Sequence, residues 1–219
     1  MTDPTQALRT VQDDLAHACR IAGRERDAVA LIAVSKTQDV DKIRPLLTAG
    51  HRVFGENRVA EAGAKWPALR KEFPDAQLHL IGQLQSNKAE AAARLFDCIQ
   101  SLDRPSLLHA LARAFDKAGR QVPCFVQVNI GDEPQKGGCA LGDLAALLAE
   151  ARGAGVPVAG LMCLPPAGLE PAPYFALLDK LAADHGLPGR SMGMSGDYAT
   201  AVMLGATHVR VGTALFGER

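Results

Sequence analysis

The feature of the sequence that most constrains the fold is a repeated unit, in which short apolar, β-branched runs alternate with stretches of helical periodicity. Such alternation is typical of parallel strands joined by crossover helices and predicts an α/β fold. The expected strands are residues 28–35, 52–55, 78–81, 98–102, 124–129, 158–164, 191–194 and 208–211. The expected helices are residues 5–22 before the first strand, and then 39–49, 56–73, 88–96, 105–118, 141–154, 173–185 and 198–204.

Eight strands alternating with helices match the repeat of a closed (β/α)8 barrel, the TIM barrel. The alternative is an open doubly wound sheet, which has about five to seven strands and carries its phosphate-binding glycines after the first one. Here the glycines cluster after the last two expected strands, at residues 193–196 and at Gly212. We therefore expect a single TIM-barrel domain over residues 1–219, with the helix at 5–22 preceding the first strand.

Composition excludes several classes of function. The 24 basic and 24 acidic residues give a formal net charge of zero, which provides no electrostatic attraction for nucleic acid or an anionic membrane. No apolar run approaches the length of a membrane span, and the N-terminus lacks the apolar core of a signal peptide. The five cysteines form no C-x-x-C pair and the six histidines show no metal-ligand spacing, so we expect a cytoplasmic protein without a metal site.

Polar and small residues follow several expected strands, on the side where a barrel carries its chemistry. They are Lys36 after the first strand, Glu56 and Asn57 after the second, Gly82 after the third, Ser195 after the seventh, and Gly212 and Thr213 after the eighth. Because the carboxyl ends of all eight strands open on one mouth, a functional site is predicted there.

Ser195, Gly212 and Thr213 together predict a site for a phosphate group. Barrels often hold a phosphate with the loops after strands seven and eight, where unpaired backbone amides favour an anion. The alternative is that Ser195 only caps the helix that follows it. Two clusters of small and hydroxyl-bearing residues at neighbouring strand ends favour the phosphate site.

Arg210 is predicted to enter the barrel. It alternates with Val209 and Val211, and the valines suit the outer face of the strand beneath the helices. A buried guanidinium needs an acceptor or an anion. Two interpretations stay open: a structural salt bridge inside the barrel, or a contact with the ring nitrogen of a ligand beside the phosphate site.

Lys36 directly follows an apolar strand and faces the same mouth as Arg210. A lysine at a strand end is most often a solvated charge. A nearby cation and a low dielectric both lower the pKa of an amine, however, and so make it available as a nucleophile. An amine, a phosphate site and a cation at ring distance form the arrangement that binds pyridoxal 5′-phosphate (PLP) as a Schiff base.

Six motifs support this interpretation. They are residues 33–36 (AVSK), 54–57 (FGEN), 79–88 (HLIGQLQSNK), 160–162 (GLM), 191–195 (SMGMS) and 209–217 (VRVGTALFG). In combination the chain resembles the PLP homeostasis proteins, the YggS/PROSC family, from about residue 5 to the C-terminus. The resemblance implies an alanine-racemase-like barrel (fold type III) without the C-terminal β-domain of the racemases.

The resemblance also implies roles for individual residues. Lys36 is expected to carry PLP covalently as a Schiff base, and Arg210 to contact the pyridine nitrogen. The phosphate contacts are expected from Ser195, Gly212 and Thr213. Asn57 is expected near the ring hydroxyl.

Three functions compete on this basis. The favoured one is intracellular PLP homeostasis, in which the protein buffers PLP and delivers it to apo-enzymes. The first alternative is a small PLP-dependent amino-acid racemase acting on free amino acids, with Tyr198 as the best candidate base. The second is a regulatory interaction protein whose PLP is structural. An arginine at the ring nitrogen leaves it unprotonated and weakens the electron sink, which favours the carrier. A monomer is expected, because the region that dimerises the racemases is missing.

His79 and Lys136 are ambiguous. His79 opens the third expected strand, away from the mouth, so a core histidine is favoured over a ligand contact. Lys136 lies in the loop after the fifth strand, on the mouth side. It is expected either to assist an incoming phosphate or to be a solvated loop residue.

Overall fold

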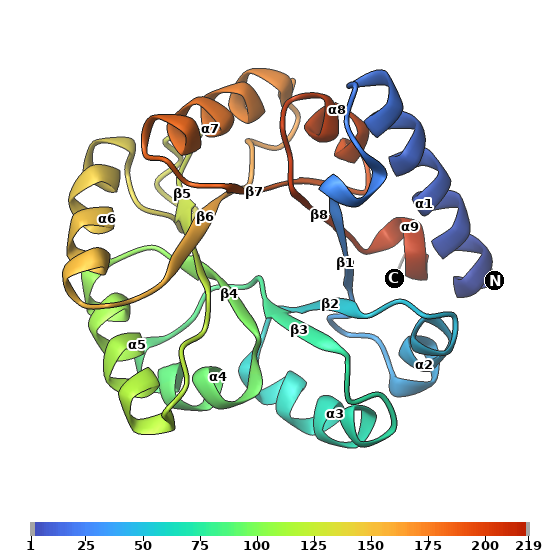
Figure 1. Cartoon of the computed structure of the whole chain (residues 1–219), viewed down its shortest axis with the longest axis horizontal. Coiled ribbons are helices and arrows are strands. Elements are labelled where there is room, and N and C mark those ends of the chain that lie inside the picture. The colour runs from blue at the N-terminus through green and yellow to red at the C-terminus, as the bar shows by residue number, and fades with distance from the viewer. Residues whose placement is uncertain (1–2, 218–219) are drawn as a thin grey trace.

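The computed structural model describes residues 3–217, which form a closed barrel of eight parallel strands in sequence order (Figure 1). The strands are β1 (Ala30–Val34), β2 (Val53–Glu56), β3 (Gln77–Leu80), β4 (Cys98–Leu102), β5 (Cys124–Val128), β6 (Val158–Cys163), β7 (Gly189–Met194) and β8 (His208–Val211). β1 pairs with β8 and places Ile32 opposite Arg210, which closes the sheet. The predicted TIM barrel is confirmed, and the open sheet is excluded.

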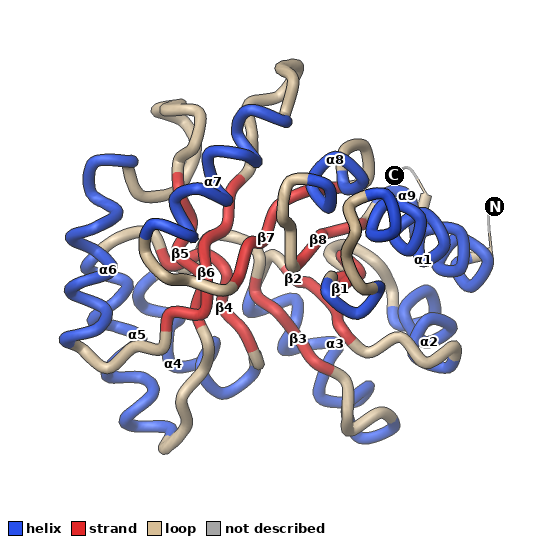
Figure 2. Tube along the Cα trace, turned by 45° about the horizontal axis from the view of Figure 1, so that its top comes forward, coloured by secondary structure: helices blue, strands red, loops and turns tan. Residues whose placement is uncertain are grey.

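Helices surround the barrel on its outer side, as Figures 1 and 2 show. They are α1 (Pro4–Ile21), α2 (Val40–Thr48), α3 (Val59–Glu72), α4 (Ala89–Leu95), α5 (Pro105–Ala118), α6 (Leu144–Gly153), α7 (Ala172–Asp184), α8 (Tyr198–Met203) and α9 (Thr213–Phe216), with 3-10 helices η1 (Arg26–Ala28), η2 (Ser86–Lys88) and η3 (Leu141–Asp143). The N-terminal α1 packs against α8 and α9 and so completes the outer ring beside β8. Within the described residues, every helix is too short or too polar to cross a membrane.

The side chains of each strand divide between two layers, as the two-residue period of a strand requires. Outward-facing residues such as Leu31 and Val209 join the large core between strands and helices. Inward-facing Cys98, Phe125 and Met162 form a separate cluster inside the barrel. Apolar side chains are thus buried on both the inner and the outer face of the strands.

The second unit differs from its predicted boundaries. β2 continues through Glu56, and α3 begins at Val59 rather than at residue 56. Arg58 still has extended backbone angles (φ −133°, ψ 130°), so the chain leaves the barrel before it turns into the helix. A short helix after β8, α9, was also not predicted.

Candidate functional site

Lys36 leaves the barrel at the end of β1. The Ser35 hydroxyl donates to Glu56 Oε1 at 2.7 Å in the helix layer, so alternation starts the Lys36 side chain on the inner side of the barrel. Lys36 is half-buried. Gly212 lies against the same strand, since a Cβ on Gly212 would stand 3.4 Å from the Val34 Cβ. The end of β8 is therefore next to the strand that carries Lys36.

Ser195 joins the loops after β7 and β8. Its Oγ accepts the backbone N–H groups of Gly212 at 3.2 Å and Ala214 at 3.4 Å. Asp197, not Ser195, is the N-cap residue of α8, so the interpretation of Ser195 as a simple helix cap is wrong. Thr213 is exposed at the start of α9. The structure thus brings a hydroxyl and two backbone amides to one point of the mouth.

Tyr198, the first residue of α8, makes its polar contact with α1. Its hydroxyl donates to Asp14 Oδ2 on α1 at 2.9 Å. Burial, together with the hydrogen bond and the negative charge of Asp14, raises the pKa of Tyr198 to about 12. In this arrangement the hydroxyl ties α8 to α1.

Arg210 enters the barrel as predicted and is 4% exposed. Its Nη1 donates to Ser191 Oγ at 2.6 Å and its Nη2 to the Cys163 carbonyl oxygen at 2.8 Å. Burial lowers the pKa of Arg210. No salt bridge of Arg210 forms among residues 3–217, so the interpretation as a structural salt bridge is wrong. The guanidinium is thus buried with neutral oxygens as its hydrogen-bond partners, and the Asp197 carboxylate acts on it only through space.

A chain of hydrogen bonds continues from Arg210 across the barrel interior. The Ser191 hydroxyl donates to Gln100 Oε1 at 2.6 Å, and Gln100 Nε2 lies 3.0 Å from His79 Nδ1. Because an amide nitrogen only donates, His79 Nδ1 is the acceptor and the proton of the neutral ring is on Nε2. Burial, with a smaller effect of His208, lowers the pKa of His79 to about 4. His79 is a buried interior residue, as favoured from the sequence.

Gln100 and Ser191 were not identified from the sequence. Both lie within buried strands, and a polar side chain in the middle of such a strand was the available signal. A buried polar residue in a strand does not reveal, however, which other strand supplies its hydrogen-bond partner.

Two mouth loops also receive definite positions. Gly82 lies against the backbone of Asn57, and a Cβ there would come within 2.3 Å of the Asn57 carbonyl oxygen. This close approach requires glycine and holds the loop after β3 against Asn57. Lys136 Nζ donates to the Pro165 carbonyl oxygen at 3.0 Å and forms an ion pair with Glu133 at 2.5 Å. Lys136 therefore links the loops after β5 and β6 and is only half-buried.

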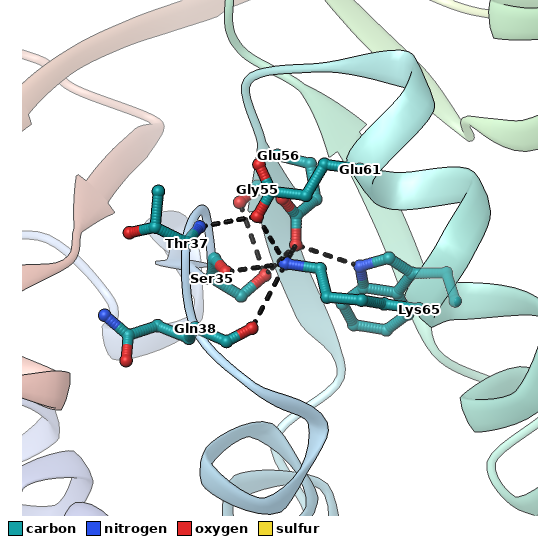
Figure 3. Close-up of polar contacts among 8 residues, drawn as sticks. Ser35, Thr37, Gln38, Gly55, Glu56, Glu61 and Lys65 are labelled. Atoms are coloured by element: carbon teal, nitrogen blue, oxygen red, sulfur yellow. Dashed lines mark hydrogen bonds and ion pairs between the residues drawn. The ribbon is translucent and has the colours of Figure 1, made fainter.

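Glu56 does not face the mouth, in contrast to the prediction. Its side chain is fully buried between β2 and α3, where Oε1 accepts from the indole N–H of Trp66 at 3.1 Å (Figure 3). The reason is the extra residue of β2, which places Glu56 on the outward-facing phase of the strand together with Phe54.

Comparison with known proteins agrees with this geometry. The family model for the alanine racemase N-terminal domain matches residues 11–219. The pyridoxal phosphate homeostasis protein of Aquifex aeolicus is 37% identical over 224 residues, covering 98% of this chain and 97% of the relative. That of Pseudomonas aeruginosa is 37% identical over 227 residues, covering 100% and 97%.

A solved structure is similar over the same range. PipY of Synechococcus elongatus, determined with PLP bound, has 40% sequence identity and a TM-score of 0.82, covering 93% of this chain and all of PipY. Fold, family model and full-length relatives agree, and the chain therefore belongs to the pyridoxal phosphate homeostasis protein family, built on the alanine racemase N-terminal domain.

Proposed function

We propose that this protein binds PLP at the mouth of the barrel and serves intracellular PLP homeostasis by buffering the cofactor and delivering it. The names of the relatives and the PLP-bound state of PipY support this function. The observation that carries it is the pair of sites on β7 and β8: the Ser195 hydroxyl between two backbone amides at the mouth, and the buried charge of Arg210 within the barrel.

The chemistry of these donors fits the cofactor. The amides of Gly212 and Ala214 and the hydroxyls of Ser195 and Thr213 are phosphate donors. Arg210 supplies a fixed cation that cannot accept a proton, which suits an unprotonated pyridine nitrogen. Asn57, beside the loop of Gly82, would lie near the ring hydroxyl.

Lys36 would hold the cofactor as a Schiff base. Its position supports this role, because it follows β1 on the inner side of the barrel, next to the strand that ends in Gly212. When bound, PLP supplies an electrophilic aldehyde and an electron-accepting ring. The residues of the chain would bind its phosphate, place the guanidinium cation of Arg210 beside its ring nitrogen and present the amine of Lys36.

The carrier function is favoured over the racemase by two features. Arg210 keeps the ring nitrogen unprotonated, which weakens the stabilisation of a carbanion. The Tyr198 hydroxyl, the candidate second base, donates to Asp14 on α1. We further propose that the protein is a monomeric, single-domain protein of the cytoplasm, and light scattering of the purified protein tests the monomer.

Borohydride reduction tests the cofactor site directly. After incubation with PLP, the wild-type protein should be yellow, and reduction should fix one pyridoxyl-phosphate mass on Lys36. Lys36→Ala should gain no such mass, while Lys180→Ala, which changes an exposed lysine of α7, should behave like the wild type. A wild-type protein that stays colourless and gains no mass would refute the proposal.

Two further assays separate the alternatives. PLP transfer to an apo-enzyme should be faster from the wild-type protein than from Lys36→Ala, and equal rates would argue against delivery through Lys36. Exchange of α-protons of amino acids in deuterated water should be slow. Fast, racemising exchange that disappears in Tyr198→Phe would instead establish the racemase.

A further inference from the structure

A cluster of charged residues lies directly behind Lys36, on the helix side of β1. Glu61 and Lys65 are one turn apart on α3, and Glu56 ends β2. Together these three residues, here called the Lys65 clamp, contact the chain on both sides of Lys36 (Figure 3). Glu61 and Lys65 were not identified from the sequence, and Glu56 was expected at the mouth instead.

Lys65 Nζ is surrounded by oxygen atoms. It donates to the backbone carbonyls of Ser35 at 3.0 Å and Gln38 at 3.3 Å, and to Glu61 Oε1 at 2.8 Å. Glu56 Oε1 lies 2.8 Å away as an ion-pair partner. The Lys65 side chain is only 12% exposed, so these contacts are shielded from water. One ammonium therefore ties together two backbone groups that flank Lys36.

Glu61 holds the third backbone group. Its Oε1 accepts the Thr37 N–H at 2.5 Å as well as the Lys65 ammonium. Partial burial opposes ionisation, but the hydrogen bonds from Lys65 and Thr37 outweigh it and lower the pKa of Glu61. The carboxylate is thus present near neutral pH, where it fixes the amide next to Lys36.

The backbone at this point has an unusual conformation. Thr37 has φ +61°, in the left-handed region that a β-branched residue rarely adopts. Such a conformation persists only where surrounding contacts determine it. The N–H of Thr37 is held by Glu61, and the carbonyls before and after the turn are held by Lys65. The clamp therefore provides the contacts that this turn requires.

We propose that Glu56, Glu61 and Lys65 are positioning residues that fix the Lys36 backbone, so that its amine is presented to the cofactor in one orientation. This inference rests on the proposed function of Lys36. Without the clamp, the backbone of the turn would sample several conformations before PLP binds and would become ordered on binding. The loss of conformational entropy on ordering would weaken the complex with the cofactor. The clamp would act through the backbone, because its printed contacts are with the residues on either side of Lys36 and with Trp66.

The clamp can be tested in the protein without PLP, by exchange of the Thr37 amide proton measured by NMR. Glu61→Ala removes the acceptor of this amide, so its exchange should become about tenfold to a hundredfold faster. Lys65→Met should accelerate it as well, because Glu61 loses its partner. Glu61→Gln keeps an oxygen acceptor and should stay within about threefold of the wild type.

The role toward the cofactor is tested on the same variants by absorbance. PLP should dissociate about tenfold faster from Lys65→Met and Glu61→Ala than from the wild type. The pH at which the absorbance band of the bound PLP is half-changed should also differ from that of the wild type. Glu61→Gln should restore both properties. Because Glu61 is partly exposed, its variants keep the test available if Lys65→Met does not fold.

Arg70→Met is the matched control. Arg70 lies on the same helix, is also partly buried, and also binds a carboxylate, that of Asp97, and a backbone carbonyl, that of Leu95. Leu95 is the last residue of α4 and Asp97 directly precedes β4, so both partners lie at the amino end of a strand, the opposite end of the barrel from Lys36. Its loss should lower stability without changing Thr37 exchange or PLP dissociation.

The possible results separate the two proposals. Wild-type PLP dissociation rates and an unshifted absorbance midpoint in both Lys65→Met and Glu61→Ala would overturn the positioning role, whether or not Thr37 exchange changes. Equal changes in Arg70→Met would also overturn it, since the effect would then be general destabilisation. A wild-type protein that takes up no PLP on Lys36 would overturn the proposed function, and the role of the clamp with it.

Discussion

The Ser191 hydroxyl is the central contact of the interior hydrogen-bond chain, and its removal gives a defined free-energy change. In Ser191→Ala, Arg210 Nη1 loses an acceptor at 2.6 Å and Gln100 Oε1 loses a donor at 2.6 Å. Ser191 is fully buried, so water does not replace the lost hydroxyl without rearrangement of the barrel interior. The loss of one oxygen atom therefore removes one hydrogen bond from each of two buried polar groups, one of them charged.

The size of the effect follows from these two groups. A buried polar group without a partner costs about 1–3 kcal/mol, and a charged group costs more. Arg210 keeps the Cys163 carbonyl and Gln100 keeps His79, so we expect a total loss of about 2–4 kcal/mol in the free energy of unfolding. With a urea dependence of about 2–3 kcal/mol per molar for a chain of this size, the unfolding midpoint should fall by roughly 1 M.

Ser101→Ala is the matched control. Ser101 is equally buried, but its hydroxyl has no hydrogen-bond partner among the described residues. Ser101→Ala removes a buried hydroxyl that makes no hydrogen bond. The free energy of unfolding of this variant should therefore be unchanged or slightly higher than that of the wild type. Urea unfolding followed by circular dichroism compares the two variants without PLP. Equal midpoints for Ser191→Ala and Ser101→Ala would refute the assignment of energy to the hydrogen-bond chain.

Three further outcomes are expected. Ser195→Ala should weaken PLP binding about tenfold by removing one charge-assisted phosphate contact, while borohydride should still fix the cofactor on Lys36; unchanged affinity in a PLP titration would contradict the phosphate site. Burial lowers the pKa of both His79 and His208 from 6.5 to about 4, so the unfolded chain binds more protons between these values, and stability present above pH 6.5 should be lost as the pH falls toward 4. The loss in the free energy of unfolding is about 3 kcal/mol for each histidine. In His79→Asn the Asn Oδ1 can replace Nδ1 as the acceptor, so the urea midpoint of this variant should depend less on pH. All five cysteines are buried and free, so they should react with a thiol reagent at neutral pH only on unfolding; rapid labelling of the folded protein would contradict their burial.

The alternation of strands and helices could be predicted from the sequence because both patterns are local. A strand repeats every two residues and a helix about every 3.6, so each segment carries its own signal. The same period of two predicted that Arg210 enters the barrel and that Val209 packs under the helices. The boundary at Glu56 was wrong, because one additional extended residue reverses the face on which a side chain lies.

The partners of these residues were decided by the tertiary structure alone. Ser191 contacts Gln100 across 91 positions of sequence, and the chain from His79 to Arg210 joins β3, β4, β7 and β8. Only the closure and register of the barrel bring those strands together, since no local period relates residues so far apart. The sequence by itself thus determined the barrel, the mouth and the inward direction of Arg210. The packing of α3 on β2 and on the turn after β1 decided that Lys65 holds the backbone behind Lys36, because that contact exists only in the folded barrel.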